Sequence, residues 1–225
     1  FDKLTAWSLI VVLQHILAAF FTYLLLRSWK VSKLGSVFGG VIFAFSGFNL
    51  IWSQWNGHAL SASFIPLIIL FTDKWLSSGR LSWGLSISIA FALLFLSGYP
   101  QIALYLALAL VLFCLIRIRD TDNWFSRFGL LGIFLFLGLG LSAFQILPGA
   151  ELLAISQREV EPHPFEWAFL PFSKVITFFA ADFYGNHANQ NYWGPQDYTS
   201  NTGFVGVASF ILASIGLICV RNKKL

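Results

Sequence analysis

The stretch LSWGLSISIAFALLFLSGYPQIALYLALALVLFCLIR, residues 81–117, decides the fold class of this chain. It consists of two apolar runs, 81–97 and 101–117, which meet at the short motif SGYP. A transmembrane helix needs about 20 predominantly apolar residues, so each run comes close to the length of a membrane span. A Gly followed closely by a Pro is typical of a turn, and we therefore expect a helical hairpin that turns at a membrane surface.

Further apolar runs of the same kind lie on both sides of this hairpin. The predicted spans are 6–26, 34–52, 59–72, 81–97, 101–117, 128–148 and 203–220. Hydrophobic residues make up 57% of the chain and charged residues only 11%, whereas about a quarter of an average soluble domain is charged. The mean hydropathy is +0.75. We therefore predict an all-α, polytopic transmembrane helical bundle of about seven spans, and the composition excludes a water-soluble globular domain.

The basic residues predict how the spans are oriented. The connections after the first, third, fifth and seventh spans hold all but three of the 14 Lys and Arg residues. These residues are Arg27, Lys30, Lys33, Lys74, Arg80, Arg117, Arg119, Arg127, Arg221, Lys223 and Lys224. Because cytoplasmic loops of membrane proteins are enriched in Lys and Arg, we expect this side to be cytoplasmic. A single kinked helix over 81–117 would break the alternation, so the hairpin is the preferred interpretation.

The pattern divides the chain into three parts. Residues 1–148 hold six predicted spans with short loops, 149–202 form one long extracytoplasmic loop containing short helices, and 203–225 hold the seventh span and a basic cytoplasmic end. Pro148 is expected to end or kink the sixth span. The chain contains no Met and begins at Phe1, so we expect it to be an internal piece of a longer protein.

Polar and small residues inside the predicted spans have different interpretations. Gln14 and His15 lie near the middle of the first span, where polar groups are costly and are candidates for function, but contact with a neighbouring helix is the favoured explanation. Small residues that recur on one helix face allow two backbones to approach closely. Such positions are Gly35, Gly39, Gly40, Ala44, Gly132, Gly138, Gly140 and Ser142.

Several common chemistries lack their signatures in this sequence. It has no His pair at helical metal-binding spacing, no Gly-rich phosphate loop and no nucleophile elbow. Asp120-Thr121-Asp122 matches the D-x-D of nucleotide-sugar transferases, but it lies in a short predicted cytoplasmic turn. We therefore predict no metal site and no cofactor, with a divalent metal as an open alternative. The net charge of +4 is explained by membrane orientation, so no nucleic-acid partner is expected.

The predicted outer face carries the candidate binding residues. His58 stands at the outer mouth of the third span, where it could contact a phosphate or a hydroxyl. Arg158 is one of three basic residues on this side, so orientation does not explain it. A planar guanidinium suits a phosphate or diphosphate, and pairing with Glu159 or Glu161 is the alternative. The long loop interleaves aromatic residues with Asn, Gln and Asp, which is typical of a carbohydrate-binding surface and also of an amphipathic loop among lipid headgroups.

Several motifs, taken in order, resemble one known group. They are Leu13-Gln14-His15, Phe45-Ser46-Gly47-Phe48, His58, Pro66-Leu67, Leu141-Ser142-Ala143, Leu147-Pro148, Asp182-Phe183-Tyr184-Gly185-Asn186, Tyr192-Trp193-Gly194-Pro195, Tyr198 and Gly203-Phe204-Val205-Gly206. With these motifs the chain resembles the YfhO-type bacterial membrane proteins, relatives of the GT-C glycosyltransferase superfamily. The likeness extends over nearly the whole chain, and it rests on the order and spacing of the motifs because each one alone is weak.

This resemblance implies a protein of the bacterial inner membrane that transfers a sugar from a polyprenyl-phosphate donor on the outer face. The acceptor would be a glycan, a protein or a lipid, and the general base would lie upstream of this piece, so the catalytic residue is unknown. For donor-phosphate binding the resemblance suggests Arg158, His58 and Gln101. For sugar or acceptor binding it suggests Glu151, Asp182, Tyr184, Asn186, His187 and Trp193.

Two other functions remain open at this point. One is a transporter or flippase for a lipid-linked or polar solute, and the other is a non-catalytic assembly protein for cell-envelope polymers. A transporter should show polar or broken helices at mid-membrane depth, often in paired repeats. Only Gln14 and His15 fit that description, and the two halves of the sequence show no repeat.

Overall fold

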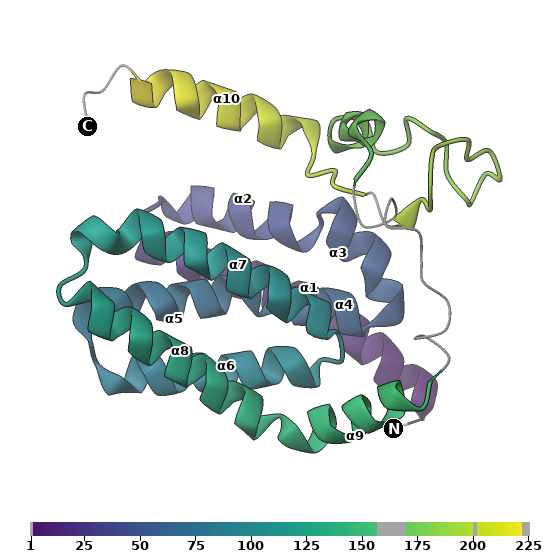
Figure 1. Ribbon diagram of the computed structural model, residues 1–225. Coiled ribbons are helices and arrows are strands. Elements are labelled where there is room, and N and C mark those ends of the chain that lie inside the picture. Colours follow the sequence, from purple (N-terminus) through teal and green to yellow (C-terminus); the bar gives the residue numbers. More distant parts are fainter. Residues whose placement is uncertain (1, 157–169, 200–201, 222–225) are drawn as a thin grey trace.

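The computed structural model describes residues 2–156, 170–199 and 202–221, and all regular structure in these ranges is helical (Figure 1). The α-helices are α1 (Lys3–Ser28), α2 (Lys33–Ala44), α3 (Gly47–Trp52), α4 (Gly57–Ser63), α5 (Ile65–Ser78), α6 (Leu81–Leu96), α7 (Pro100–Arg117), α8 (Trp124–Leu141), α9 (Ala143–Ala154) and α10 (Val207–Arg221). Short 3-10 helices are η1 (Ser53–Trp55), η2 (Ile118–Asp120) and η5 (Phe172–Phe178). The predicted all-α fold is confirmed.

Four helical segments are long and apolar enough to cross a membrane: α1, the combined Gly57–Ser78, α7 and α8. The bent pair Lys33–Ala44 and Gly47–Trp55 makes a fifth if it is one span. The fourth and seventh predicted spans correspond to the shorter apolar helices α6 and α10. Large apolar side chains such as Leu34, Ile116 and Phe136 are 73–81% exposed, which suits contact with lipid and not with water. The structure is therefore a bundle of membrane-spanning helices.

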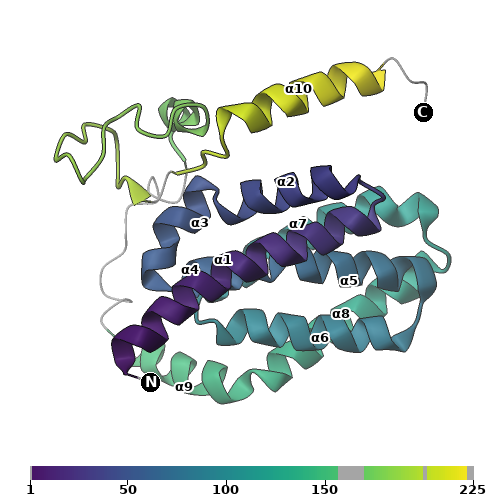
Figure 2. The same cartoon turned by 180° about the vertical axis from the view of Figure 1, so that it is seen from behind.

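The helices run back and forth, so the bundle has two distinct ends (Figures 1 and 2). The turns α1–α2, α5–α6 and α7–α8, which carry the basic connections, lie at one end. The α3–α4 bend, the α6–α7 turn, α9 and the segment 170–199 lie at the other end. The expected hairpin is confirmed, because α6 ends at Leu96, α7 begins at Pro100, and Gly98 turns the chain with φ +96°.

The sixth predicted span ends earlier than the sequence suggested. The break falls at Ser142, which separates α8 from α9, whereas Pro148 lies inside α9. The hydroxyl of Ser142 donates to the Gly138 carbonyl at 2.9 Å, in addition to the Ser142 amide at 3.2 Å, and such back-bonding by a serine often bends helices. Of the two predicted effects of Pro148, ending the span is therefore wrong, because α9 continues past residue 148.

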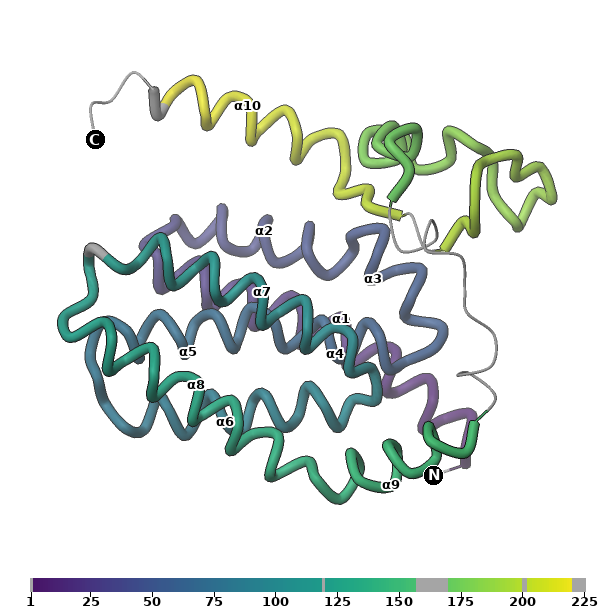
Figure 3. Tube along the Cα trace, viewed as in Figure 1, coloured from purple at the N-terminus to yellow at the C-terminus, as the bar shows by residue number. Residues whose placement is uncertain are grey.

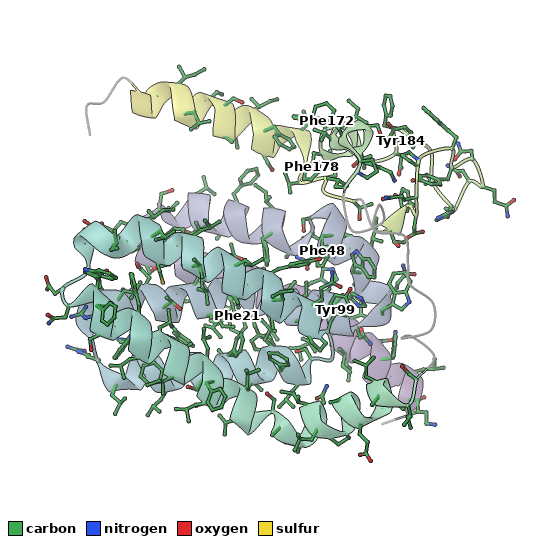
Figure 4. All side chains as sticks on the ribbon, viewed as in Figure 1. Phe21, Phe48, Tyr99, Phe172, Phe178 and Tyr184 are labelled. Carbon is green, nitrogen blue, oxygen red and sulfur yellow. The ribbon has the colours of Figure 1, made fainter. Side chains whose placement is uncertain are left out.

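The core of the bundle lies among α5, α6, α7 and α8. Its most deeply buried apolar side chains are Ile68, Leu76, Ile87, Leu94 and Leu106, each at most 1% exposed. An edge-to-face contact between Trp75 and Phe134, with ring centres 4.9 Å apart, joins α5 to α8. Figure 4 shows Phe21 of α1 lying within the bundle, and its ring centre is 5.8 Å from that of Phe64.

Glycine allows two pairs of helices to approach closely. A Cβ atom at Gly40 of α2 would lie 2.6 Å from the Ala19 carbonyl oxygen of α1, and one at Gly138 of α8 would lie 2.8 Å from the Ser88 carbonyl oxygen of α6. The predicted close packing is confirmed at these two positions. A Cβ atom at Gly132 would meet nothing within 4 Å, so that position does not require glycine.

A buried carboxylate joins three helices at the basic end. Asp73 of α5 is 6% exposed and forms an ion pair with Arg117 of α7, whose Nε donates to Oδ1 at 2.8 Å. The indole of Trp29, just after α1, donates to the other carboxylate oxygen at 3.3 Å. Because two donors from different helices meet one buried acid, this contact fixes how α1, α5 and α7 pack.

We predict that Gly40→Ala lowers the thermal stability of the protein. The new methyl group would meet backbone, which cannot turn away as a side chain can, so α1 and α2 must separate at a cost of about 1–3 kcal/mol. Gly132→Ala is the matched control and should leave stability unchanged or raise it, because alanine favours the helix. Thermal unfolding in detergent measures both, and equal shifts would contradict the packing argument.

Asp73→Ala should also destabilise the protein, by about 1.5–3 kcal/mol, because the guanidinium of Arg117 and the indole of Trp29 lose their shared acceptor. The control is Asp122→Ala, which removes an exposed acid from the same end of the bundle. Unfolding temperatures in the same detergent should separate the two variants. If Asp73→Ala leaves the unfolding temperature unchanged, the ion pair contributes nothing to stability.

Candidate functional site

The segment 170–199 folds around one buried lysine. Lys174 is 1% exposed, and its Nζ donates to the hydroxyl of Tyr192 and, at 3.4 Å, to the carbonyl of Asp197. The same ammonium lies 5.8 Å from the ring centre of Tyr184 and 5.1 Å from that of Tyr192. Burial lowers the pKa of Lys174, while the negative charge of Asp197 acts in the opposite direction. Cation–π and hydrogen-bond contacts with Tyr184, Tyr192 and Asp197 thus hold this segment together.

Tyr184 lies in the interior of the segment. Its side chain is buried, and its hydroxyl donates to the Ser173 carbonyl at 2.9 Å. The amide of Trp193 donates to the Tyr184 carbonyl at 2.9 Å, and the two rings meet with centres 4.7 Å apart. The ring of Phe183 also lies 5.0 Å from that of Tyr184, so aromatic contacts on two sides hold Tyr184 in place.

Asp182 organises a second group of polar side chains. One carboxylate oxygen accepts from the hydroxyl of Tyr198 at 2.8 Å, and the other accepts from the amide of Asn186 at 3.3 Å. Burial, together with the hydrogen bond to Asp182 and its charge, raises the pKa of Tyr198 to about 12. The hydroxyl of Tyr198 therefore stays protonated at neutral pH and keeps donating to Asp182.

Asp197 and His187 form a pair beside this group. The Nε2 atom of His187 lies 3.7 Å from Oδ1 of Asp197. The other carboxylate oxygen accepts from the amide of Thr199 at 3.1 Å, which fixes the orientation of the acid. The rings of Tyr192 and Tyr198 flank the imidazole, with centres 5.3 and 5.6 Å away.

A cleft of about 720 Å³ lies between this segment and the α3–η1 turn of the bundle. One wall consists of Leu50, Ile51, Gln54 and Trp55, and the other of Asn186, His187, Ala188, Asp197, Tyr198 and Thr199. Figure 3 shows these two parts of the chain, far apart in sequence, at the same end of the molecule. The amide of Gly47 donates to the Phe204 carbonyl at 2.6 Å and so holds the stretch between the segment and α10 against α3. An aromatic face with amide, hydroxyl, carboxylate and imidazole groups suits a polar, hydroxyl-rich ligand.

An aromatic cluster connects the cleft to two of the predicted donor-site residues. The ring of His58 lies between those of Trp52 and Tyr99, with centres 4.2 and 3.6 Å away, and Trp52 contacts Trp55 at 5.0 Å. The hydroxyl of Tyr99 donates to the side-chain carbonyl of Gln101 at 2.7 Å. The structure therefore brings His58 and Gln101 together through Tyr99, next to the cleft wall formed by Trp55.

The other predicted residues occupy different positions. Asn186 and His187 line the cleft, and Asp182 supports its wall through Tyr198. Trp193 is exposed but is not part of the lining, and Glu151 is exposed on α9, on the opposite side of the bundle from the segment (Figures 1 and 2). Arg158 lies outside the described residues.

Several site residues are not among the binding residues predicted from the sequence, although Tyr198 belongs to the motifs quoted above. These are Gln54, Trp55, Lys174, Asp197, Tyr198 and Thr199. Lys174 carried a usable signal, because it is one of three basic residues on the side where basic residues are scarce. In the described parts of the chain, no group of three or more His, Cys, Asp or Glu side chains could hold a metal ion.

Comparisons with known proteins give one positive result. No curated protein and no solved structure matches the chain. The family model described as bacterial membrane protein YfhO matches residues 4–222, which is nearly the entire sequence. Its description agrees with the membrane-spanning helices found here. The chain therefore belongs to the YfhO family of bacterial membrane proteins.

Proposed function

We propose that the full-length protein is an integral membrane glycosyltransferase of the GT-C type, which transfers a sugar from a polyprenyl-phosphate donor to a glycan, protein or lipid acceptor. The cleft between α3–η1 and the segment 170–199 is the observation that carries this proposal. Trp55 offers a ring on which a sugar face can stack, and Asn186, His187 and Asp197 offer partners for its hydroxyls.

The position of the cleft fits a donor that is part lipid and part sugar. The long polyprenyl chain would lie in the bilayer against the exposed apolar faces of the helices, such as those at Ile116 and Phe136. The sugar and phosphate would then reach the polar end of the bundle, where the cleft lies. A soluble nucleotide-sugar donor would need no such arrangement.

Transfer from a lipid phosphate has two chemical requirements. A base must take the proton of the acceptor hydroxyl, and cationic or donor groups must stabilise the phosphate as it leaves. We assign the leaving phosphate to Arg158, His58 and Gln101, and the sugar to the cleft walls. Tyr184 and Lys174 then act by shaping the segment, because both are buried.

We also propose that the bundle lies in the inner membrane with its basic end in the cytoplasm. The basic connections lie at one end of the fold and the segment 170–199 at the other, as the positive-inside rule requires of such an orientation. Transfer then takes place on the extracytoplasmic face.

A second candidate function is movement of a lipid-linked or polar solute across the membrane. The observation that favours it is the 47° bend between Lys33–Ala44 and Gly47–Trp55, whose second half contacts the buried Gln14 of α1 through Ser53. Broken helices with polar neighbours are frequent at transporter binding sites.

The transfer reaction can be tested on the full-length protein in membranes with a radiolabelled polyprenyl-phosphate sugar. Trp55→Ala should lower kcat/KM by about tenfold or more, since tenfold corresponds to about 1.4 kcal/mol and a lost stacking contact is of that order. Trp124→Ala is the matched control, because Trp124 is similarly exposed (45% against 47%) but lies at the basic end.

The possible outcomes separate the candidate functions. If only the Trp55 variant loses transfer, the result supports the cleft as the sugar site. Equal activity of both variants would contradict this assignment. If the wild type never transfers label but the donor crosses the bilayer, the transport function replaces the transferase.

Orientation can be measured by cysteine labelling in intact cells, in a Cys114→Ala, Cys219→Ala background. His187→Cys should react with a membrane-impermeant maleimide added outside, because His187 is exposed at the extracytoplasmic end. Asp122→Cys should react only after the membrane is permeabilised. The reverse pattern would overturn the proposed orientation.

A further inference from the structure

The helical ladder is interrupted where α2 meets α3. The Phe45 amide still donates to Val41, but the Ser46 amide donates only to Phe43, and the Gly47 amide leaves the helix to donate to Phe204. The two helices meet at a 47° bend. Inside a bilayer, such a break needs polar partners, because no bulk water is available there.

Two buried carboxamides contact the two halves of this bent pair. Gln14 of α1 is 1% exposed and Asn49 of α3 is 2% exposed. Their NH₂ groups donate to the Ser53 carbonyl at 3.3 Å and to the Phe43 carbonyl at 2.6 Å. Because the nitrogen must face each carbonyl, the orientation of both amides is fixed. Their oxygens, Gln14 Oε1 and Asn49 Oδ1, are buried and have no partner among the described residues.

His15 adds a third acceptor of the same kind. Its Nδ1 lies 2.8 Å from the Val11 carbonyl and must therefore carry a hydrogen, so in the neutral imidazole Nε2 is an acceptor. Nε2 is buried without a partner in the described structure, and the ring centre lies 5.5 Å from that of Phe45, at the break itself.

These groups determine what chemistry could satisfy the site. All three unpartnered groups are acceptors, so a partner that satisfies them must supply donors or positive charge. The carboxyl end of α2 also points at the break, and the partial negative charge of a helix C-terminus attracts cations. None of the described acids lies within α1, α2 or α3. Because Ca²⁺ and Mg²⁺ sites depend on carboxylates, a monovalent cation fits better than a divalent one.

We propose that the α2–α3 break and the facing turn of α1 bind a monovalent cation through Gln14 Oε1 and Asn49 Oδ1. Na⁺ and K⁺ prefer oxygen ligands and therefore engage the two oxygens, whereas ammonium can also donate to the ring nitrogen of His15. The site is separate from the cleft, and it does not depend on the proposed transfer reaction.

The test is thermal unfolding of the full-length protein in detergent while NaCl, KCl or NH₄Cl replaces choline chloride at constant ionic strength. We expect a saturable rise in Tm with at least one of these cations. The rise should reach about 5–10 °C when the cation is at roughly 100 times its Kd, because only the folded state binds it. Gln14→Met and Asn49→Leu should abolish this dependence on the cation.

Thr72→Val is the matched control, because it removes a fully buried hydroxyl that also has no partner but lies on α5. That variant should keep the full rise in Tm. The proposal would be overturned if the wild-type Tm is the same with all three cations and the Gln14→Met variant is more stable than the wild type in every salt. Saturable binding of radioactive Na⁺ or Rb⁺ to the wild type gives an independent measurement if a variant fails to fold, and its absence also overturns the proposal.

Discussion

The constraint on which this structure depends is that backbone amides and carbonyls in a bilayer must find partners within the protein. Helices satisfy this constraint along most of the chain, because each amide bonds to a carbonyl one turn away. The places where a helix stops therefore show how the remaining backbone groups find partners. At Ser142 the hydroxyl bonds back to Gly138 and allows α8 to end. At Gly47 the amide finds Phe204, from a segment more than 150 residues later in the sequence. The second solution ties the bundle to the loop and thereby creates the cleft.

That single bond explains why the two candidate sites share one short element. Along α3 and η1, Asn49 and Ser53 are buried and face α1, where Gln14 contacts Ser53. Leu50 follows Asn49, Gln54 follows Ser53, and both line the cleft. Side chains four residues apart share a helix face, so these two pairs occupy two different faces of the same turn. A stretch that has only nine residues, 47–55, thus separates a buried polar site from an open one.

The sequence predicted the parts of the fold that depend on local composition. Apolar runs located the helices, and alternating basic connections placed consecutive turns at opposite ends, which also brought His58 and Gln101 together. What could not be predicted depends on contacts between distant residues. Hydropathy treats 34–52 as one uniform run, although the partner that breaks it is Phe204. The burial of Lys174 depends on Tyr184, Tyr192 and Asp197, whose positions no periodicity reveals.

The shared element bears on how transfer and transport should be distinguished. Two sites are coupled when both bias the position of one element that has more than one arrangement. The α3–η1 stretch contacts both sites, and its preceding break frees it from the rigid ladder of α2. A cation at Gln14 and Asn49 would fix the buried face of this stretch and so set the position of Gln54 and Trp55 in the cleft wall. A polar break in a span therefore does not by itself indicate transport, because the same feature can organise a binding surface at the end of the bundle.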